Sequence, residues 1–525
     1  MPRISPCRSA TFCALAFVIV GSMAFPSAPR AETAQDPASA KALLGDVLEY
    51  ITELVASSGE GLTPEMGGEA SAQPIGNRVE MIFPDPSILD QDGSGFHMEN
   101  VTATVTPQEK HTFQFSVGLP NSVTVSDAEG KPKGAVSWSE SAMRGIWRAD
   151  IETATAFHGA LKNVRITEPS EGGTLEFGRI DSIVLDQELK QSANGWWSGP
   201  YTFDVSNIEI APPGEDEQIS LEAVSLSGSF QDFDLAAWQA LSEWGSSISI
   251  PEEGTEANPF GDSLAAARIF EAMNLGAGNM ALKVSNLRFG PPGIDDFSMG
   301  GLRLTMSYDN NARPGAYNLG VEWADLEQID SDLPPAFFTH TGSLKLHLEQ
   351  FPIRQILTLV LRESDNLGPS GSFENPDAIQ LMVMPLINAN QTALRLEELV
   401  LRSTTAALAA SGNISARNNT ALGFIGEAHL EITGLDKLIV VAARQAESGE
   451  DAPNLLAFLT LAKGLGKPEV GADGEIVYIF DILLPADGTI QINEIPLNLL
   501  RDSGTTALPE LRPRASSANA EAPRS

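Results

Sequence analysis

Residues 112–119, Thr-Phe-Gln-Phe-Ser-Val-Gly-Leu, alternate between apolar side chains and small or polar ones. Phe113, Phe115, Val117 and Leu119 would share one face of a strand, because successive side chains of a strand point to opposite sides of a sheet. The same alternation recurs along the chain, in 101–105, 175–177, 203–205, 282–284, 302–308 and 344–348. The sequence therefore predicts a long series of half-buried strands.

Gly and Asn separate the alternating stretches, as turns between neighbouring strands require. Between residues 77 and 230 no regular helical stretch of ten to fifteen residues separates two strands, which disfavours a parallel α/β sheet. We expect a mainly β (α+β) fold made of elongated antiparallel sheet with a few short flanking helices. One long sheet and two lobes both fit this pattern.

Six segments have the helical spacing of apolar residues. They are 39–58, 234–244, 263–274, 354–365, 436–448 and 453–463. Asp234 and Asp262 are suited to cap the second and third of these helices. The last two strands are expected at 476–484 and 490–497, joined by a hairpin turn at Asp487-Gly488.

Composition shifts divide the chain into six parts. We expect a signal peptide at 1–31, a helix and loop at 32–75, a β-rich lobe at 76–245, a linker at 246–261, a β-rich lobe with helices at 262–503 and a disordered tail at 504–525. The linker is rich in Ser, Pro, Glu and Gly, and the tail has few apolar residues.

One short pattern recurs in the strand-forming regions: apolar, any residue, Asn, apolar, any residue, apolar. It occurs as LKNVRI (161–166), VSNIEI (205–210) and VSNLRF (284–289), and MENVTA (98–103) is close to it. The spacing between copies is irregular, which excludes a fixed-period solenoid. The pattern indicates that one strand-and-bulge unit is reused in an elongated sheet.

The N-terminus has the features of a secretory signal peptide. Arg3 and Arg8 precede an apolar stretch at 10–25, and small residues allow cleavage after Ala24 or Ala31. The stretch is shorter than the ~20 residues of a membrane-spanning helix. We expect a periplasmic protein; the alternative is a protein anchored in the inner membrane by an uncleaved leader.

Both cysteines, Cys7 and Cys13, lie in this leader, so the mature chain would hold neither a disulfide nor a thiolate site. The chain has 69 acidic residues and a net charge of −36. Such a charge repels nucleic acid and anionic lipid head groups. We interpret it as a solubility feature rather than a cation site, and expect no nucleic-acid partner.

No motif for catalysis, a cofactor or a metal is found. The six histidines show no ligand spacing, and Asp90-Gln91-Asp92-Gly93 lacks the first ligand of a calcium loop. The segment Gly276-Ala277-Gly278-Asn279-Met280-Ala281 follows a helix instead of a strand, the reverse of a dinucleotide fingerprint. We therefore predict no catalytic, cofactor-binding or metal-binding residue, although a glycosidase-like carboxylate pair stays open.

Trp196 and Trp197 are the candidate ligand-binding residues. They stand in the turn-rich sequence NGWWSGPY. Exposed aromatic rings there would stack on a sugar or enter a membrane interface. The alternative interpretation is packing at the edge of a strand.

The last third of the chain carries a resemblance. It runs from Leu394 to Leu438 (LRLEELVLRSTTAALAASGNISARNNTALGFIGEAHLEITGLDKL) and from Gly474 to Leu497 (GEIVYIFDILLPADGTIQINEIPL). This order of strands, helix and Asp-Gly hairpin resembles the closing module of YdgA-like and AsmA-like envelope proteins. It resembles more closely an uncharacterised family of alphaproteobacterial periplasmic proteins of about this length. The resemblance implies an antiparallel sheet curved around an apolar groove, with no catalytic residues.

The leading hypothesis is a non-enzymatic envelope protein that binds lipid or another apolar ligand along a curved sheet. A protein-interaction or scaffold module without a small ligand, with an envelope protein as partner, is the first alternative. A carbohydrate-active hydrolase is the second alternative. A wide apolar cavity would favour ligand binding, and a filled core would favour the scaffold.

Overall fold

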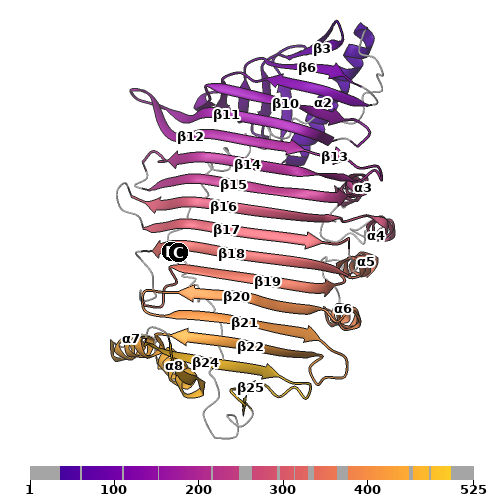
Figure 1. Cartoon of the computed structure of the whole chain (residues 1–525). Coiled ribbons are helices and arrows are strands. Elements are labelled where there is room, and N and C mark those ends of the chain that lie inside the picture. Colours follow the sequence, from indigo (N-terminus) through magenta and orange to yellow (C-terminus); the bar gives the residue numbers. More distant parts are fainter. Residues whose placement is uncertain are drawn as a thin grey trace, which may run out of the picture.

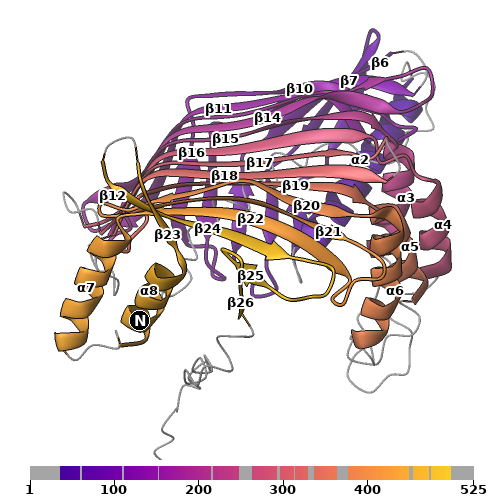
Figure 2. The same cartoon turned by 60° about the horizontal axis from the view of Figure 1, so that its bottom comes forward.

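The computed structural model describes residues 36–58, 62–108, 111–151, 153–214, 217–246, 263–291, 296–311, 314–328, 336–363, 376–448, 453–471 and 474–497. These residues form one antiparallel sheet of 26 strands with seven helices beside it. The sheet is elongated and curved (Figure 1, Figure 2), which confirms the mainly β fold. The expected leader and tail, and nearly all of the linker, lie outside the described residues.

A compact lobe begins the structure. It consists of α2 (Pro37–Ser58), β1 (Thr63–Met66), β2 (Ser71–Ile75), β3 (Arg78–Phe83), β4 (Pro86–Leu89), β5 (Gly95–Met98), β6 (Val101–Pro107), β7 (Thr112–Gly118), β8 (Ser122–Ser126), β9 (Pro132–Ser137) and β10 (Glu140–Arg148). The strands form two ribbons, β2–β3–β6–β7–β10 and β1–β4–β5–β8–β9. Both ribbons meet at β11 (Thr153–Ser170), whose first half pairs with β10 and whose Arg165–Thr167 pair with β9.

The core of this lobe lies between α2 and the strands. Leu43, Leu44 and Val47 of α2 are buried, and their spacing places them on one side of the helix. They pack in one cluster with Phe115 of β7 and with other apolar residues of the ribbons. Asp36 caps the helix, because its carboxylate accepts hydrogen bonds from the backbone N–H groups of Ala38 and Ser39 at 2.9 and 3.0 Å.

From β11 onward the strands follow one another in chain order (Figure 1). They are β12 (Gly173–Glu188), β14 (Trp197–Ile210), β15 (Gln218–Phe233), β16 (Ala277–Gly290), β17 (Phe297–Asp309), β18 (Gly315–Gln328), β19 (Thr341–Phe351), β20 (Ala393–Arg402), β21 (Ala407–Ala416), β22 (Phe424–Thr433) and β24 (Ile476–Leu484). Four short strands pair at the margins of this ladder: β13 (Lys190–Gln191), β23 (Lys467–Val470), β25 (Gln491–Ile492) and β26 (Ile495–Pro496).

The remaining helices lie at the two rims of the ladder, where the strands end. They are α3 (Leu235–Ser246), α4 (Ser263–Ala272), α5 (Ile353–Glu363), α6 (Pro376–Asn390), α7 (Leu435–Ser448) and α8 (Pro453–Leu465). Figure 2 shows the ladder as an arch, with α3 to α6 along one rim and α7 and α8 at the other. All six helices project to the inner side of the arch.

A row of residues with positive φ crosses the ladder at one level. Asn163, Asn207, Asn286 and Asp325 lie on alternate strands, and each has φ of 49° or 50°. Asn and Asp tolerate this left-handed conformation better than other residues with a side chain. The register skips each of them together with its neighbour on the next strand. One residue is skipped on each strand and the register continues unchanged, so these positions are not β-bulges, and the bulge expected from the sequence pattern is not found there.

The recurring Asn pattern of the sequence marks three of these four positions. Asn163, Asn207 and Asn286 are its third positions. Asn100 of the similar MENVTA segment is not one, since it precedes β6 and is not among the described residues with positive φ. Asp325 is the position that the pattern missed, because Asp replaces Asn there and Gln328 stands where the pattern has an apolar residue.

Substitution of Asn286 separates the backbone requirement from the side-chain hydrogen bond. The side-chain amide of Asn286 donates to the Glu222 carboxylate, and Ala and Gly both lose that bond. We expect Asn286→Ala to lower the free energy of unfolding by about 1–2 kcal/mol relative to Asn286→Gly, since only Gly adopts positive φ without strain. Urea denaturation of the two variants measures the difference, and equal stabilities would contradict a strained backbone at this position.

Three details of the predicted organisation need correction. Helix α6 was not expected, and it contains Pro385. Residues 62–75, predicted as loop, contain β1 and β2, which pair with β4 and β3. The strand predicted over 490–497 is split into β25 and β26, because Asn493 and Glu494 between them have φ of 48° and 69°.

The chain segments on either side of the linker expected at 246–261 belong to one continuous sheet. β15 and β16 pair from Gln218↔Gly290 to Gln231↔Ala277. The ladder therefore runs across this position. The part of the chain that stands out as a compact lobe is the N-terminal one, which ends where β11 joins the two ribbons to the ladder.

Candidate functional site

The register of the ladder gathers apolar side chains on one face, because cross-strand partners share a face. One row crosses β14 to β20 as Tyr201, Gly228, Met280, Met306, Leu319, Leu346 and Leu396. The adjacent row on this face is Phe203, Leu226, Leu282, Leu304, Val321, Leu344 and Leu399. The row between them faces the other side and is mostly polar: Thr202, Ser227, Ala281, Thr305, Gly320, Lys345 and Glu398.

The apolar face is the inner face of the arch. At the C-terminal end α7 and α8 pack on Leu430 and Phe480, which belong to this face. At the other end the lobe core includes Leu161 and Ile183 of the same face. Since the helices project to the inside of the arch (Figure 2), the apolar face lines a trough. We call this surface, formed by the two apolar rows given above, the apolar trough.

The middle of the apolar trough is open. Met280, Met306 and Leu319 stand side by side on β16, β17 and β18, and they are 38, 43 and 43% exposed. Isolated exposed apolar residues are ordinary on protein surfaces. A continuous apolar surface that extends over many strands is different, and it is typical of a binding site.

The rim of the trough below α3, α4 and α5 is deepened into an aromatic cavity of about 600 Å³. We call it the rim cavity. Its aromatic walls are Trp197, Phe230, Phe233, Trp238, Phe270, Tyr308 and Tyr317. Phe230 stacks on Tyr201, with the ring centroids 5.2 Å apart, and Phe233 lies 5.6 Å from Phe230. The rim cavity therefore continues the aromatic surface of the trough.

The two candidate tryptophans have different positions. Trp197 is 4% exposed, lines the rim cavity, and lies under the Arg148 guanidinium carbon, which is 5.5 Å from the ring centroid. Trp196 is half-buried in the turn before β14 and does not line the cavity. Sequence reasoning did not find the tyrosines of this region. The signal that could have found them is a glycine inside each of two strands, β15 and β16.

Tyr317 lines the rim cavity and donates a hydrogen bond of 2.5 Å to Asn310 Oδ1. Burial raises the pKa of Tyr317 to about 12. A tyrosine of the unfolded chain ionises near pH 10. The neutral phenol of Tyr317 therefore contributes stability that is complete below about pH 10 and is lost as the pH rises toward 12.

We expect Tyr317→Phe to flatten the alkaline stability profile. The wild-type chain should lose more unfolding free energy between about pH 9 and pH 11.5 than the variant does, because the variant has no phenol to ionise at this position. Urea denaturation at a series of pH values measures both profiles. Parallel profiles would show that Tyr317 titrates as it does in the unfolded chain.

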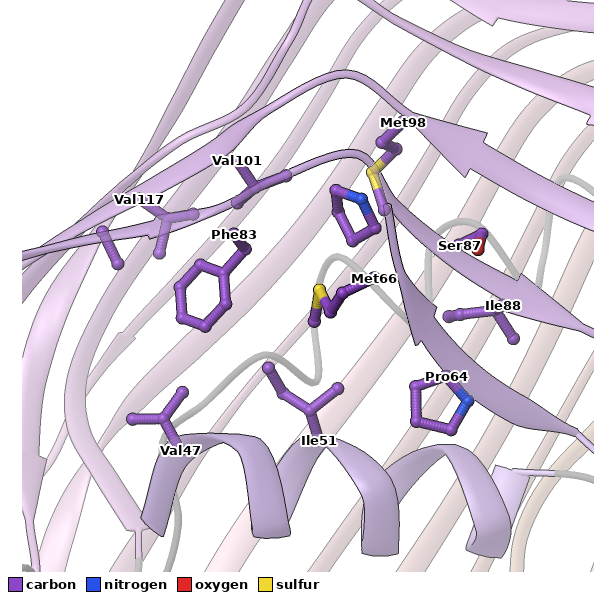
Figure 3. A pocket seen from close by; sticks show the side chains of 12 residues that line it. Val47, Ile51, Pro64, Met66, Phe83, Ser87, Ile88, Met98, Val101 and Val117 are labelled. Carbon is purple, nitrogen blue, oxygen red and sulfur yellow. The ribbon is translucent and has the colours of Figure 1, made fainter. Parts of the chain in front are cut away.

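A second, smaller cavity lies inside the N-terminal lobe (Figure 3). Its volume is about 50 Å³. Val47 and Ile51 of α2 form one wall, and Met66, Phe83 and Met98 of the strands face them (Figure 3). Its size is that of a packing void more than of a ligand site, since an engineered cavity that binds benzene measures about 150 Å³. We attribute it to the lobe core.

Charged groups gather on the polar face. His429 contacts Asp481 at 2.8 Å and Glu431 at 3.2 Å, and these hydrogen bonds raise the pKa of the imidazole. In the described ranges no group of three or more His, Cys, Asp or Glu side chains has an arrangement that could hold a metal ion. Asp90 and Asp92 lie in the turn between β4 and β5 and accept backbone hydrogen bonds there.

Among the helices described, none combines the length and the apolar content that crossing a bilayer requires. No protein-family model, curated protein or solved structure matches the chain.

Proposed function

We propose that the chain is an exported, non-enzymatic envelope protein that binds a lipid or another apolar ligand in the apolar trough. The observation that supports it is the continuous apolar inner face, open to solvent at Met280, Met306 and Leu319. A bound lipid would cover this exposed apolar surface. The leader-like N-terminus and the resemblance to AsmA-like proteins agree with the same proposal.

The trough has a length suited to lipid chains. Neighbouring strands are about 4.8 Å apart, so the two apolar rows from β14 to β20 extend over about 29 Å. The hydrocarbon core of a bilayer, which holds two acyl chains end to end, is about 30 Å thick. A chain lying lengthwise would therefore be covered over all its carbons.

Burial of an acyl chain would supply a large part of the binding energy. Each methylene group removed from water contributes about 0.8 kcal/mol, so ten buried methylenes contribute about 8 kcal/mol. This exceeds the lower estimates of the association cost, about 4 kcal/mol. If the apolar side chains of the trough only packed against one another, the trough would not need to be open.

Photo-crosslinking in the native envelope tests the proposal. The photoreactive residue benzoylphenylalanine is placed at Leu319, on the trough side of β18, or at the neighbouring Asn318, on the polar side. We expect lipid adducts at position 319 and none at 318, detected by mass spectrometry of the purified chain. Protein adducts alone at 319 would favour the scaffold alternative, and equal lipid labelling at both positions would contradict a specific trough.

Cell fractionation tests the compartment. We expect the chain in the periplasmic fraction with its N-terminus cleaved after Ala24 or Ala31. An intact leader in the membrane fraction would favour the anchored alternative, and an intact leader in the cytosol would contradict export.

A further inference from the structure

Two tyrosines lean toward each other where the apolar trough meets the rim cavity, Tyr201 in the trough and Tyr308 in the cavity wall. Tyr201 lies on β14 and Tyr308 on β17, with β15 and β16 between them. The intervening strands provide Gly228 opposite Tyr201 and Gly278 opposite Tyr308. A Cβ atom added to Gly228 would lie 2.5 Å from the hydroxyl oxygen of Tyr201. A Cβ atom added to Gly278 would lie 2.8 Å from the hydroxyl oxygen of Tyr308. Each ring therefore lies over the glycine of its neighbouring strand.

This arrangement places polar atoms on an apolar surface. Met280 and Met306 are the neighbours of Gly228 along the same row, and Phe230 stacks on the Tyr201 ring. Within the described part of the chain, the hydroxyl of neither Tyr201 nor Tyr308 has a hydrogen-bond partner. Tyr317 differs, since its hydroxyl is bonded to Asn310.

The two hydroxyls are suited to donate to a ligand. Both tyrosines are half-buried, so water can reach their hydroxyls in the empty trough, and a ligand that covers them must supply another hydrogen-bond partner. Burial raises the pKa of both tyrosines, so they are neutral O–H donors at ordinary pH. An acceptor oxygen on the ligand would meet this requirement, whereas a hydrocarbon would not.

We infer that Tyr201 and Tyr308 bind the oxygen-bearing end of a long-chain amphiphile, with a carboxylate or an ester as the acceptor. This inference rests on the proposed function, because the apolar remainder of the ligand occupies the open row at Met280, Met306 and Leu319. The trough then distinguishes amphiphiles from plain hydrocarbons. The Arg354 guanidinium, next to Tyr317, donates to the backbone oxygen of Glu271 at 2.8 Å and caps the end of α4.

The test uses three probes with one pyrene-labelled sixteen-carbon chain: the carboxylic acid, its methyl ester and the alkane. Affinities are measured by fluorescence titration for the wild-type chain and for Tyr201→Phe/Tyr308→Phe. The control is Tyr478→Phe, whose hydroxyl is bonded to Asp436 away from the trough. Circular dichroism and thermal melting establish that each variant is folded, since Phe keeps the ring and its packing.

We expect the double variant to bind the acid or the ester roughly tenfold more weakly, the loss of two hydrogen bonds. Its affinity for the alkane should stay within about twofold of wild type, and the control should match wild type for every probe. If the double variant loses affinity only for the acid, the ligand group is a carboxylate. If it loses affinity for both the acid and the ester, an ester oxygen is a sufficient acceptor.

Equal weakening for the alkane would overturn the inference, because the tyrosines would then act only through packing. Unchanged affinity for all three probes would overturn it as well, placing the oxygen elsewhere. Failure of the wild-type chain to bind any probe is a distinct result, which contradicts the proposed function itself.

Discussion

The double variant Met306→Glu/Leu319→Glu is expected to bind apolar ligands roughly 100-fold more weakly than the wild-type chain. Both side chains lie on the open part of the trough and are 43% exposed, so carboxylates are hydrated there while the trough is empty. A ligand that covers them must remove that water. The desolvation of two unpaired carboxylates costs at least about 3 kcal/mol, which corresponds to the 100-fold loss.

The matched control is Ser307→Glu/Asn318→Glu. These residues are the chain neighbours of Met306 and Leu319 and lie on the polar face of β17 and β18. Both double variants add the same charge, so general repulsion is equal in the two. Fluorescence titration with a pyrene-labelled alkane measures the difference. Equal affinities for the two double variants would mean that the inner face is not where the ligand lies.

Phe115→Ala is expected to destabilise the N-terminal lobe by about 3–5 kcal/mol, the usual cost of removing a buried phenylalanine ring. Phe115 is 1% exposed and belongs to the core cluster that contains α2. Its ring centroid is 6.3 Å from that of Phe157 on β11. Its loss would therefore weaken the strand that joins the lobe to the ladder.

Gln114→Ala is the control for this prediction, because Gln114 is exposed on the other side of β7. Urea denaturation followed by circular dichroism measures both variants. If the first transition involves the lobe, only Phe115→Ala should shift it to lower urea. A difference of less than about 0.5 kcal/mol, the usual range of surface substitutions, would show that the lobe core does not depend on this ring.

The fold was predictable to the extent that its signals are local. The alternation at 113–119 follows from the two-residue repeat of a strand, and the structure places Phe113, Phe115 and Val117 in the core of the lobe. The spacing of Leu43, Leu44 and Val47 predicted α2 in the same way. Helix α6 failed this test, since Pro385 inside it usually marks a helix end.

The row of positive-φ residues is an intermediate case. An Asn between two apolar positions is a local signal, and it identified Asn163, Asn207 and Asn286. That these residues stand at one level of the ladder depends on the register of the strands that separate them. Register is a long-range property, since one residue of slip would move a whole side-chain set to the other face.

The candidate site was less predictable from the sequence than the fold was. Trp196 and Trp197 were chosen as adjacent aromatic residues in a turn, yet only Trp197 lines the rim cavity. Tyr201 and Tyr308 are more than a hundred residues apart in the chain. Their proximity follows from the pairing of four strands, and no pattern in either segment encodes it.

By itself, the order of amino acids determined which residues alternate and which residue types can adopt positive φ. These properties arise from each residue's own side chain and backbone conformation, so they are visible in a short window. Only the tertiary structure decided that the apolar face is the inner one, that it stays open at Met280, Met306 and Leu319, and that Tyr201 and Tyr308 lie over glycines of the strands between them. Those features depend on curvature, register and helix placement, which are set by contacts between segments far apart in the chain.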